Sequence, residues 1–227
     1  MVEVTVGEVG FGASGARRQL VGCSLVTLAD AAVIVASILA VGSLVPQAVR
    51  LLRTRDVVGV SVLWTALGAV TNLAWFAYAL ARGLWAGVPA TLATACFYAF
   101  LFVTLVRFGG RAGAAVLGGI AWAVLLTGVT LIGGWSALGA VLGMSYAVQV
   151  APSLWTAWRT YAPTGIAPGT WVLFFVQVIL WGYYGVEEQD WAIKGFAVTG
   201  IVSSSLMLLR WAMTRSRQSQ PAIAAAV

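Results

Sequence analysis

Seven long apolar runs follow one another along this chain of 227 residues. A helix needs about 20 apolar residues to cross a hydrocarbon core of about 30 Å, whereas a membrane barrel shows short alternating stretches. Of all residues 61% are hydrophobic and 9% are charged, against roughly 45–50% and about 25% in a soluble domain. The sequence therefore predicts an all-α membrane protein with seven transmembrane helices. The predicted spans are about 29–52, 60–81, 85–106, 112–133, 136–158, 167–186 and 190–212.

The basic residues divide unevenly between the two sides that seven crossings create. Nine arginines follow the odd-numbered spans, and the other side carries four basic residues and three acidic ones. Cytoplasmic loops are enriched in Lys and Arg, so we expect a cell-membrane protein with its N-terminus outside and its C-terminus in the cytoplasm. The charges are scattered rather than gathered on one face, so the net charge of +6 predicts no nucleic-acid partner. The nine are Arg50, Arg53, Arg55, Arg107, Arg111, Arg159, Arg210, Arg215 and Arg217; the four are Arg17, Arg18, Arg82 and Lys194.

The two ends of the chain lie outside the apolar runs. Residues 1–28 are rich in glycine and begin with acidic rather than basic residues, which is unlike a cleaved signal peptide. We expect them to form an extracellular lead-in or an N-terminal extension of the first span. Residues 213–227 are polar, and we expect a disordered cytoplasmic tail.

A repeat with a constant offset of 106 residues relates the first three spans to the last three. Three spans joined directly to three more would turn the second block upside down, and one extra crossing restores its orientation. The sequence therefore predicts two parallel three-helix repeats, residues 29–106 and 136–212, joined by an inversion linker helix at 107–135 that ends at the turn Gly133-Gly134. The matched pairs are Pro46/Pro152, Arg53/Arg159, Thr54/Thr160, Gly59/Gly165, Trp75/Trp181, Tyr78/Tyr184 and Trp85/Trp191.

Trp75 and Trp181 lie in the middle third of their spans, away from the interfaces where Trp normally gathers. A pseudo-twofold axis would bring both rings toward the bundle centre, where they could contact the apolar face of a ligand; ordinary packing between helices is the alternative. Asn72 precedes Trp75 by one turn and Gln177 precedes Trp181 by four residues. Amides at this depth are costly unless they face protein or water, so both are candidate binding residues, with interhelical hydrogen bonding as the alternative.

Pro46 and Pro152 interrupt otherwise apolar spans. Proline removes one backbone hydrogen bond and obstructs the preceding turn of a helix. Each is therefore a candidate hinge, with a static bend as the alternative. Placement at equivalent positions of both repeats favours the hinge.

The sequence has few of the residues that a metal, cofactor, catalytic or proton-coupling site requires. The chain has no His, and its two cysteines, Cys23 and Cys96, have no ligand-like spacing, so we expect neither a metal nor another cofactor. We find no catalytic motif and expect no enzyme. Every Asp and Glu of the spans lies at a span end, so a coupled proton has no obvious carrier. For Lys194 we expect a pair with Asp190, or snorkelling.

The segments Val45-Pro46-Gln47, Arg53-Thr54 and Val58-Gly59-Val60-Ser61, followed by Asn72-x-x-Trp75-x-x-Tyr78, resemble the PQ-loop repeat of SWEET and SemiSWEET sugar transporters. The second repeat departs in having Ser153 after Pro152, but Trp181-x-x-Tyr184-Gly185 keeps the pattern. The resemblance covers roughly 31–106 and 137–212, and SWEET repeats are parallel. It implies a 3+1+3 arrangement, gating at Pro46, Gln47 and Pro152, and alternating access without a coupling ion.

The third helix of each repeat departs from the family pattern. The family places a sugar-contacting Asn sixteen residues after each Trp, and the same count here reaches Thr91 and Ala197. Both positions are candidate substrate contacts by this resemblance. Replacement of two amides by a hydroxyl and a methyl leaves the solute less closely defined than the fold.

The function predicted from the sequence is facilitated diffusion of a small neutral polar solute, a sugar first. A transporter of the same fold for an amino acid or a vitamin-like nucleoside is one alternative, and a membrane adaptor or sensor is another. Besides lipid and the solute, the partner left open is a second copy of the chain.

Overall fold

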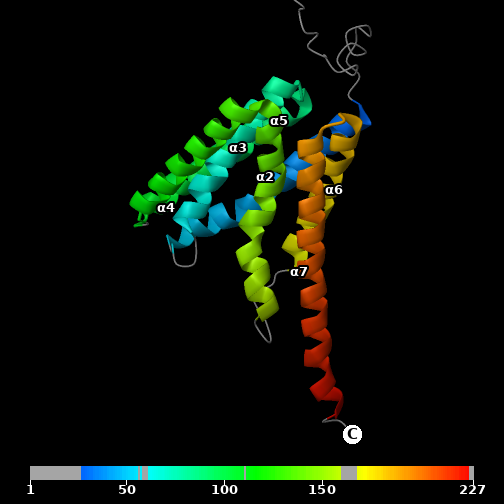
Figure 1. The fold of residues 1–227 in the computed structure, drawn as a ribbon. Helices are drawn as coiled ribbons and strands as arrows, with labels where there is room; N and C mark the ends of the chain where they lie inside the picture. Colours follow the sequence, from blue (N-terminus) through cyan, green and yellow to red (C-terminus); the bar gives the residue numbers. More distant parts are fainter. Residues whose placement is uncertain (1–26, 56, 58–60, 110, 160–167, 225–227) are drawn as a thin grey trace, which may run out of the picture.

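The computed structural model describes residues 27–55, 57, 61–109, 111–159 and 168–224, with the side chains of residues 46, 47, 50, 152, 153, 156 and 215–224 excepted. Regular structure in this part of the chain is entirely helical (Figure 1). The predicted lead-in lies almost wholly outside the described residues. The elements are α2 (Leu28–Thr54), α3 (Val62–Arg82), the 3-10 helix η1 (Trp85–Gly87), α4 (Val88–Arg107), α5 (Gly113–Arg159), α6 (Pro168–Glu187) and α7 (Trp191–Ala224).

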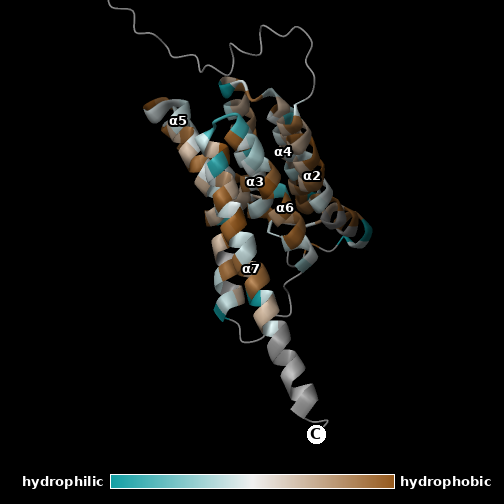
Figure 2. Cartoon of the chain, turned by 90° about the vertical axis from the view of Figure 1, so that its right-hand side faces the viewer, coloured by the Kyte–Doolittle hydropathy of each residue, from teal (hydrophilic) through white to brown (hydrophobic). Residues whose placement is uncertain are grey.

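Six helical segments of the described chain are long and apolar enough to cross a membrane, so this is a multi-pass membrane protein. The helices begin and end within three residues of the predicted span ends, apart from the far end of α7. Six segments replace the seven predicted spans because α5 covers both 112–133 and 136–158. Large apolar side chains such as Leu131 and Ile132 are exposed, as expected of a surface that faces lipid. Hydrophobic residues recur along the helices, where they are brown in Figure 2.

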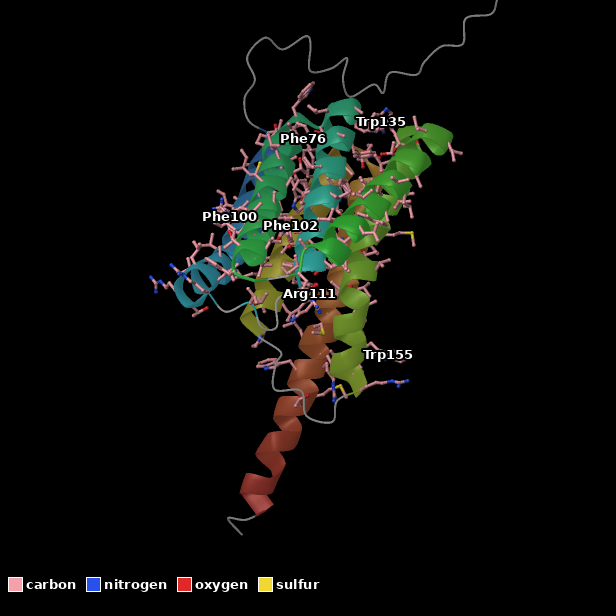
Figure 3. The ribbon with its side chains drawn as sticks, turned by 90° about the vertical axis from the view of Figure 1, so that its left-hand side faces the viewer. Phe76, Phe100, Phe102, Arg111, Trp135 and Trp155 are labelled. Atoms are coloured by element: carbon pink, nitrogen blue, oxygen red, sulfur yellow. The ribbon has the colours of Figure 1, made fainter. Side chains whose placement is uncertain are left out.

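Helical geometry in α5 breaks at Gly134, whose φ of 67° and ψ of −169° suit glycine alone. The arm before the break packs on α3, where a Cβ on Gly119 would lie 3.6 Å from that of Ala66. The arm after it packs on α7, where a Cβ on Gly143 would lie 2.8 Å from the carbonyl oxygen of Ala192. The chain turns back at this point, and the two arms run in opposite directions (Figures 1 and 3).

The far end of α7 corrects the expectation of a disordered tail. The helix continues to Ala224, well beyond the predicted span end. Residues 213–220 contain no glycine or proline, and Arg, Gln and Met are good helix formers. A polar segment of good helix formers can therefore continue a membrane helix.

The helices contact one another in a closed ring. In the described chain, α2 contacts α4 and α6, α3 contacts α4 and α5, and α7 contacts α5 and α6. The backbones of α2 and α3, and those of α5 and α6, do not come close to each other among these residues. In each predicted repeat the third helix therefore lies between the first and the second. We call α2, α3 and α4 the first set, and the second arm of α5 with α6 and α7 the second set.

Among the side chains that the structure describes, the buried core joins the two sets at one end. At the end where α2 begins, one cluster includes Val33, Tyr78, Leu142, Tyr184 and Ile193, which come from both sets. We call this the joined end, and it lies at the top of Figure 1. At the opposite end, which carries the arginine-rich helix ends, the buried cluster Ala48, Leu51, Leu101 and Leu105 belongs to α2 and α4. We call this the basic end, and the sets diverge toward it (Figure 1).

Candidate functional site

A cavity of about 390 Å³ lies between the two sets and is lined from α2, α3, α4, α5, α6 and α7. Its volume is within the roughly 300–1,000 Å³ of small-molecule sites. The lining residues are mostly aromatic, hydroxyl-bearing or small. They include Ser37, Ser43, Trp64, Thr71, Asn72, Trp75, Thr91, Thr94, Tyr98, Tyr146, Gln149, Phe174, Gln177, Trp181 and Phe196.

Five of the six residues predicted to contact a solute line this cavity. They are Trp75, Trp181, Asn72, Gln177 and Thr91. Ala197, the sixth, is only 3% exposed and does not line it. Ala197 faces α6, where its Cβ lies 3.0 Å from the position that a Cβ on Gly182 would occupy. Its neighbour Phe196 lines the cavity instead.

The three candidate hinge residues lie in continuous helix. Pro46 and Gln47 are within α2, and Pro152 is within the second arm of α5. Their side chains lie outside the described part of the structure. A role for them in gating stays a prediction.

Equivalent positions of the two repeats line the same cavity. Seven pairs of lining residues are separated by the offset of 106, so a site built from matching faces of both sets follows from the repeat. Gln177 is equivalent to Thr71 and not to Asn72, the residue with which the sequence grouped it. The pairs are Ala40/Tyr146, Ser43/Gln149, Trp64/Thr170, Thr71/Gln177, Trp75/Trp181, Gly87/Ile193 and Ala90/Phe196.

Several polar groups of the lining already donate a hydrogen bond to their own helix. The Asn72 amide nitrogen donates to the carbonyl of Gly68 at 2.9 Å, and the Thr94 hydroxyl donates to that of Ala90 at 2.8 Å. Their oxygens remain acceptors for a solute. Gln177 is 8% exposed, and its amide has no hydrogen-bond partner among the described residues. Because it lines the cavity and its donors and acceptor are not used by another described residue, Gln177 is the best-placed group to bind a polar solute.

The cavity lining is neutral. Among the described residues that line it there is no Asp, Glu, Lys or Arg. Burying an ion here would lack a compensating partner, which favours a neutral solute over a charged one. The described residues also contain no group of three His, Cys, Asp or Glu that could hold a metal ion.

A polar cluster joins the two sets just beyond the cavity, at the joined end. The Tyr78 hydroxyl donates to Oδ2 of Asp190 at 2.8 Å, and Nε of Arg82 lies 3.6 Å from the same oxygen. Oδ1 of Asp190 caps α7 by accepting from the backbone N–H groups of Ala192 and Ile193, both at 3.0 Å. Asp190 is 2% exposed. We call Tyr78, Arg82 and Asp190 the Asp190 cluster.

Of the two expectations for Lys194, the pair with Asp190 is wrong, and snorkelling stays a prediction. Nζ of Lys194 donates to Oε1 of Gln189 at 3.3 Å and lies 4.6 Å from the centre of the Trp191 ring. Because Asp190 caps its own helix, its carboxylate points inward to Tyr78 and away from Lys194. Asp190 is the first residue of the last predicted span, a position where an Asp indicates a helix cap. No sequence signal indicated its bond to Tyr78 of the first repeat.

The aromatic rings of the lining contact one another in an order that the sequence did not predict. Phe196 lies edge-on to Trp75 at 6.0 Å and to Tyr146 at 5.8 Å between ring centres. Tyr146 stacks on Phe174 at 4.4 Å with 14° between the planes. Trp75 also contacts Tyr78 edge-on, and Trp181 contacts Tyr184 in the same way; in each pair the tyrosine follows three residues after the tryptophan.

Comparison with known families gives one match, a family model described as PQ loop repeat, over residues 28–87. The match covers α2, α3 and η1, within the first repeat, and supports the PQ-loop part of the resemblance. PQ-loop proteins are membrane proteins and typically transporters. No curated protein and no solved structure matches the chain.

Proposed function

We propose that this protein is a passive transporter that carries a small neutral polar solute, a sugar first, across the cell membrane by alternating access. The observation that carries the proposal is the neutral cavity lined by seven equivalent pairs from the two sets. A site on a pseudo-twofold axis can be reached from either side when the sets rock against each other.

The chemistry of the lining fits a sugar. The apolar face of a sugar ring packs on aromatic side chains, here Trp75 and Trp181, while its hydroxyls need neutral donors and acceptors. Gln177, Asn72 and Thr91 supply them from α6, α3 and α4. Ala197 is too deeply packed to add a contact, so the two repeats would hold the solute unequally.

The described conformation supports a state that is closed at the joined end. There the core cluster and the Asp190 cluster connect the sets, whereas the core at the basic end stays within the first set. Transport requires the Asp190 cluster to part and the basic end to close. Pro46, Gln47 and Pro152 would allow the helices to bend in this exchange.

We further propose a topology of seven crossings in which each arm of α5 spans the membrane. Residues 107–135 are then the inversion linker, the joined end faces outside, and the basic end faces the cytoplasm. Gln189→Cys and Arg111→Cys test this in a variant without Cys23 and Cys96. An impermeant thiol reagent added to intact cells should label position 189 and spare position 111, and the reverse result would invert the topology.

Uptake by the purified chain in sealed vesicles tests the proposed function. The panel contains labelled glucose, an uncharged amino acid and a nucleoside. Uptake of glucose above that of empty vesicles is expected, whereas uptake of the amino acid alone would change the solute class. No uptake of any member would favour an adaptor or sensor.

A further inference from the structure

Four of the aromatic residues that line the cavity form one continuous wall. Trp75, Phe196, Tyr146 and Phe174 all line the cavity, and each contacts the next. We call these four residues the aromatic wall. Three of them come from the second set, so the wall is a property of that set.

The offset of 106 residues identifies the positions of the first set that are equivalent to the aromatic wall. The residues equivalent to Tyr146, Phe174 and Phe196 are Ala40, Gly68 and Ala90. Tyr98 closes over Gly68, since a Cβ there would lie 2.6 Å from the Tyr98 ring. The first set lines the cavity with the edge-on pair Trp64 and Tyr98 and with five hydroxyls, those of Ser37, Ser43, Thr71, Thr91 and Thr94.

A second pocket of about 100 Å³ adjoins the cavity along the same rings. It is lined by Ser43, Tyr146, Thr170, Trp171, Phe174 and Gln177, and all of these except Trp171 also line the main cavity. The stacked pair Tyr146–Phe174 and the edge-on ring of Trp171, 6.5 Å from Phe174, make it strongly aromatic. Gln177, the buried amide without a described partner, lies at the border of both spaces.

We propose that the solute is a neutral sugar joined to a flat aromatic ring, as in an aryl glycoside or a nucleoside, with the ring against the aromatic wall. The sugar hydroxyls bind the hydroxyl-rich side from α2, α3 and α4, and Gln177 bonds a polar atom near the junction. A lone hexose would leave the pocket beside Tyr146 and Phe174 without an apolar occupant. This inference rests on the proposed transport of a sugar-like solute and narrows its class.

Two matched pairs of probes test the contribution of the ring. Phenyl β-D-glucoside is compared with D-glucose, and uridine with D-ribose, by titration calorimetry on the purified chain in lipid nanodiscs. The ring should tighten binding in at least one pair by about tenfold, which is about 1.4 kcal/mol. The pair that responds distinguishes an aryl glycoside from a nucleoside.

Variants of the wall locate the effect. Phe174→Leu and Tyr146→Leu keep apolar volume but remove the flat ring face, so each should reduce the preference for the ring-bearing probe at least about threefold, roughly half of the tenfold preference in free energy. The preference is the ratio of the Kd of the plain sugar to the Kd of the ring-bearing probe, measured on the same variant. Phe100→Leu is the matched control, because Phe100 is exposed on the outside of α4 (Figure 3).

The outcomes separate this inference from the proposed function. Equal binding of both members of both pairs, with sugar uptake intact, would overturn the aromatic solute and leave the transporter in place. An unchanged preference in both Leu variants would overturn the role of the wall. If no probe binds or enters vesicles, the proposed function fails and this inference fails with it.

Discussion

Tyr78 and Asp190 are 112 positions apart and are joined by a 2.8 Å hydrogen bond between the two helix sets. The bond is buried, it lies between the cavity and the joined end, and Arg82 adds a charge to it. In the alternating access that we propose, this contact has to break whenever the joined end opens, so its strength should set how often that end opens.

Weakening this contact should expose the cavity from the joined end. Asp190→Asn keeps a side-chain oxygen to cap α7 but loses the charge that faces Arg82, and Tyr78→Phe loses only the hydroxyl. A hydrogen bond to a charged group contributes about 1.5–3 kcal/mol. The reporter is Leu84→Cys, in a variant without Cys23 and Cys96, because Leu84 is buried and lines the cavity at this end. Its labelling by an impermeant reagent should become about tenfold faster, since about 1.4 kcal/mol corresponds to a factor of ten.

Lys194→Gln is the control for this experiment. Lys194 lies at the same end but bonds Gln189 rather than Asp190, so labelling at position 84 should not change. If Asp190→Asn and Tyr78→Phe also left the labelling rate unchanged, the Asp190 cluster would have no part in gating.

Truncation of either central tryptophan should weaken solute binding. Trp75→Ala and Trp181→Ala each remove an aromatic face from the cavity and should raise Kd at least about tenfold. Trp135→Ala is the control, because Trp135 is exposed near the break in α5. Calorimetry with the tightest-binding probe measures the change in Kd. Equal Kd values for the three variants would mean that Trp75 and Trp181 only pack between helices and do not contact the solute.

The break in α5 should depend on glycine at position 134. A side chain on Gly134 is strained by its positive φ, at a cost of roughly 1–3 kcal/mol, so Gly134→Ala should lower the melting temperature of the purified protein. Gly128→Ala is the matched control, since it lies within a helix where an added Cβ would contact nothing within 4 Å. Tryptophan fluorescence during heating measures both, and equal melting temperatures would mean that residue 134 adopts another backbone conformation.

The helices could be predicted because apolar runs of membrane-span length are a strong signal. The turn at Gly133-Gly134 was visible for the same reason, as two glycines between two such runs. Trp75 and Trp181 could be placed in a cavity because the repeat puts them at the same depth about a common axis. Gln177 could be placed there because an amide at membrane depth is costly unless it faces protein or water. The ends of membrane helices and the polar residues within them can thus be recognised from the sequence.

The aromatic wall and the Asp190 cluster could not be predicted in the same way. Tyr146, Phe174 and Phe196 lie in apolar spans, where an aromatic residue that faces lipid and one that faces a cavity look alike in sequence. The inward turn of Asp190 depends on the approach of α3 to the start of α7, a contact between the two sets. The position of a residue along its apolar span predicts its depth in the membrane, but it does not predict whether the side chain faces lipid or the cavity.

Transport should be a uniport that only equilibrates its solute. The described lining of the cavity has no Asp, Glu, Lys or Arg to change charge during the cycle, and the buried carboxylate of Asp190 is engaged by Tyr78, Arg82 and two backbone N–H groups. A coupled proton would contribute about 2.3 kcal/mol per 100 mV of membrane potential, and without a titrating group in the lining this energy cannot act on the solute. In proteoliposomes the final internal concentration should therefore equal the external one, with or without an imposed pH gradient or potential. Accumulation above the external level that collapses on adding a protonophore would contradict the uniport, and Asp190→Asn would then be the first variant to test for loss of coupling.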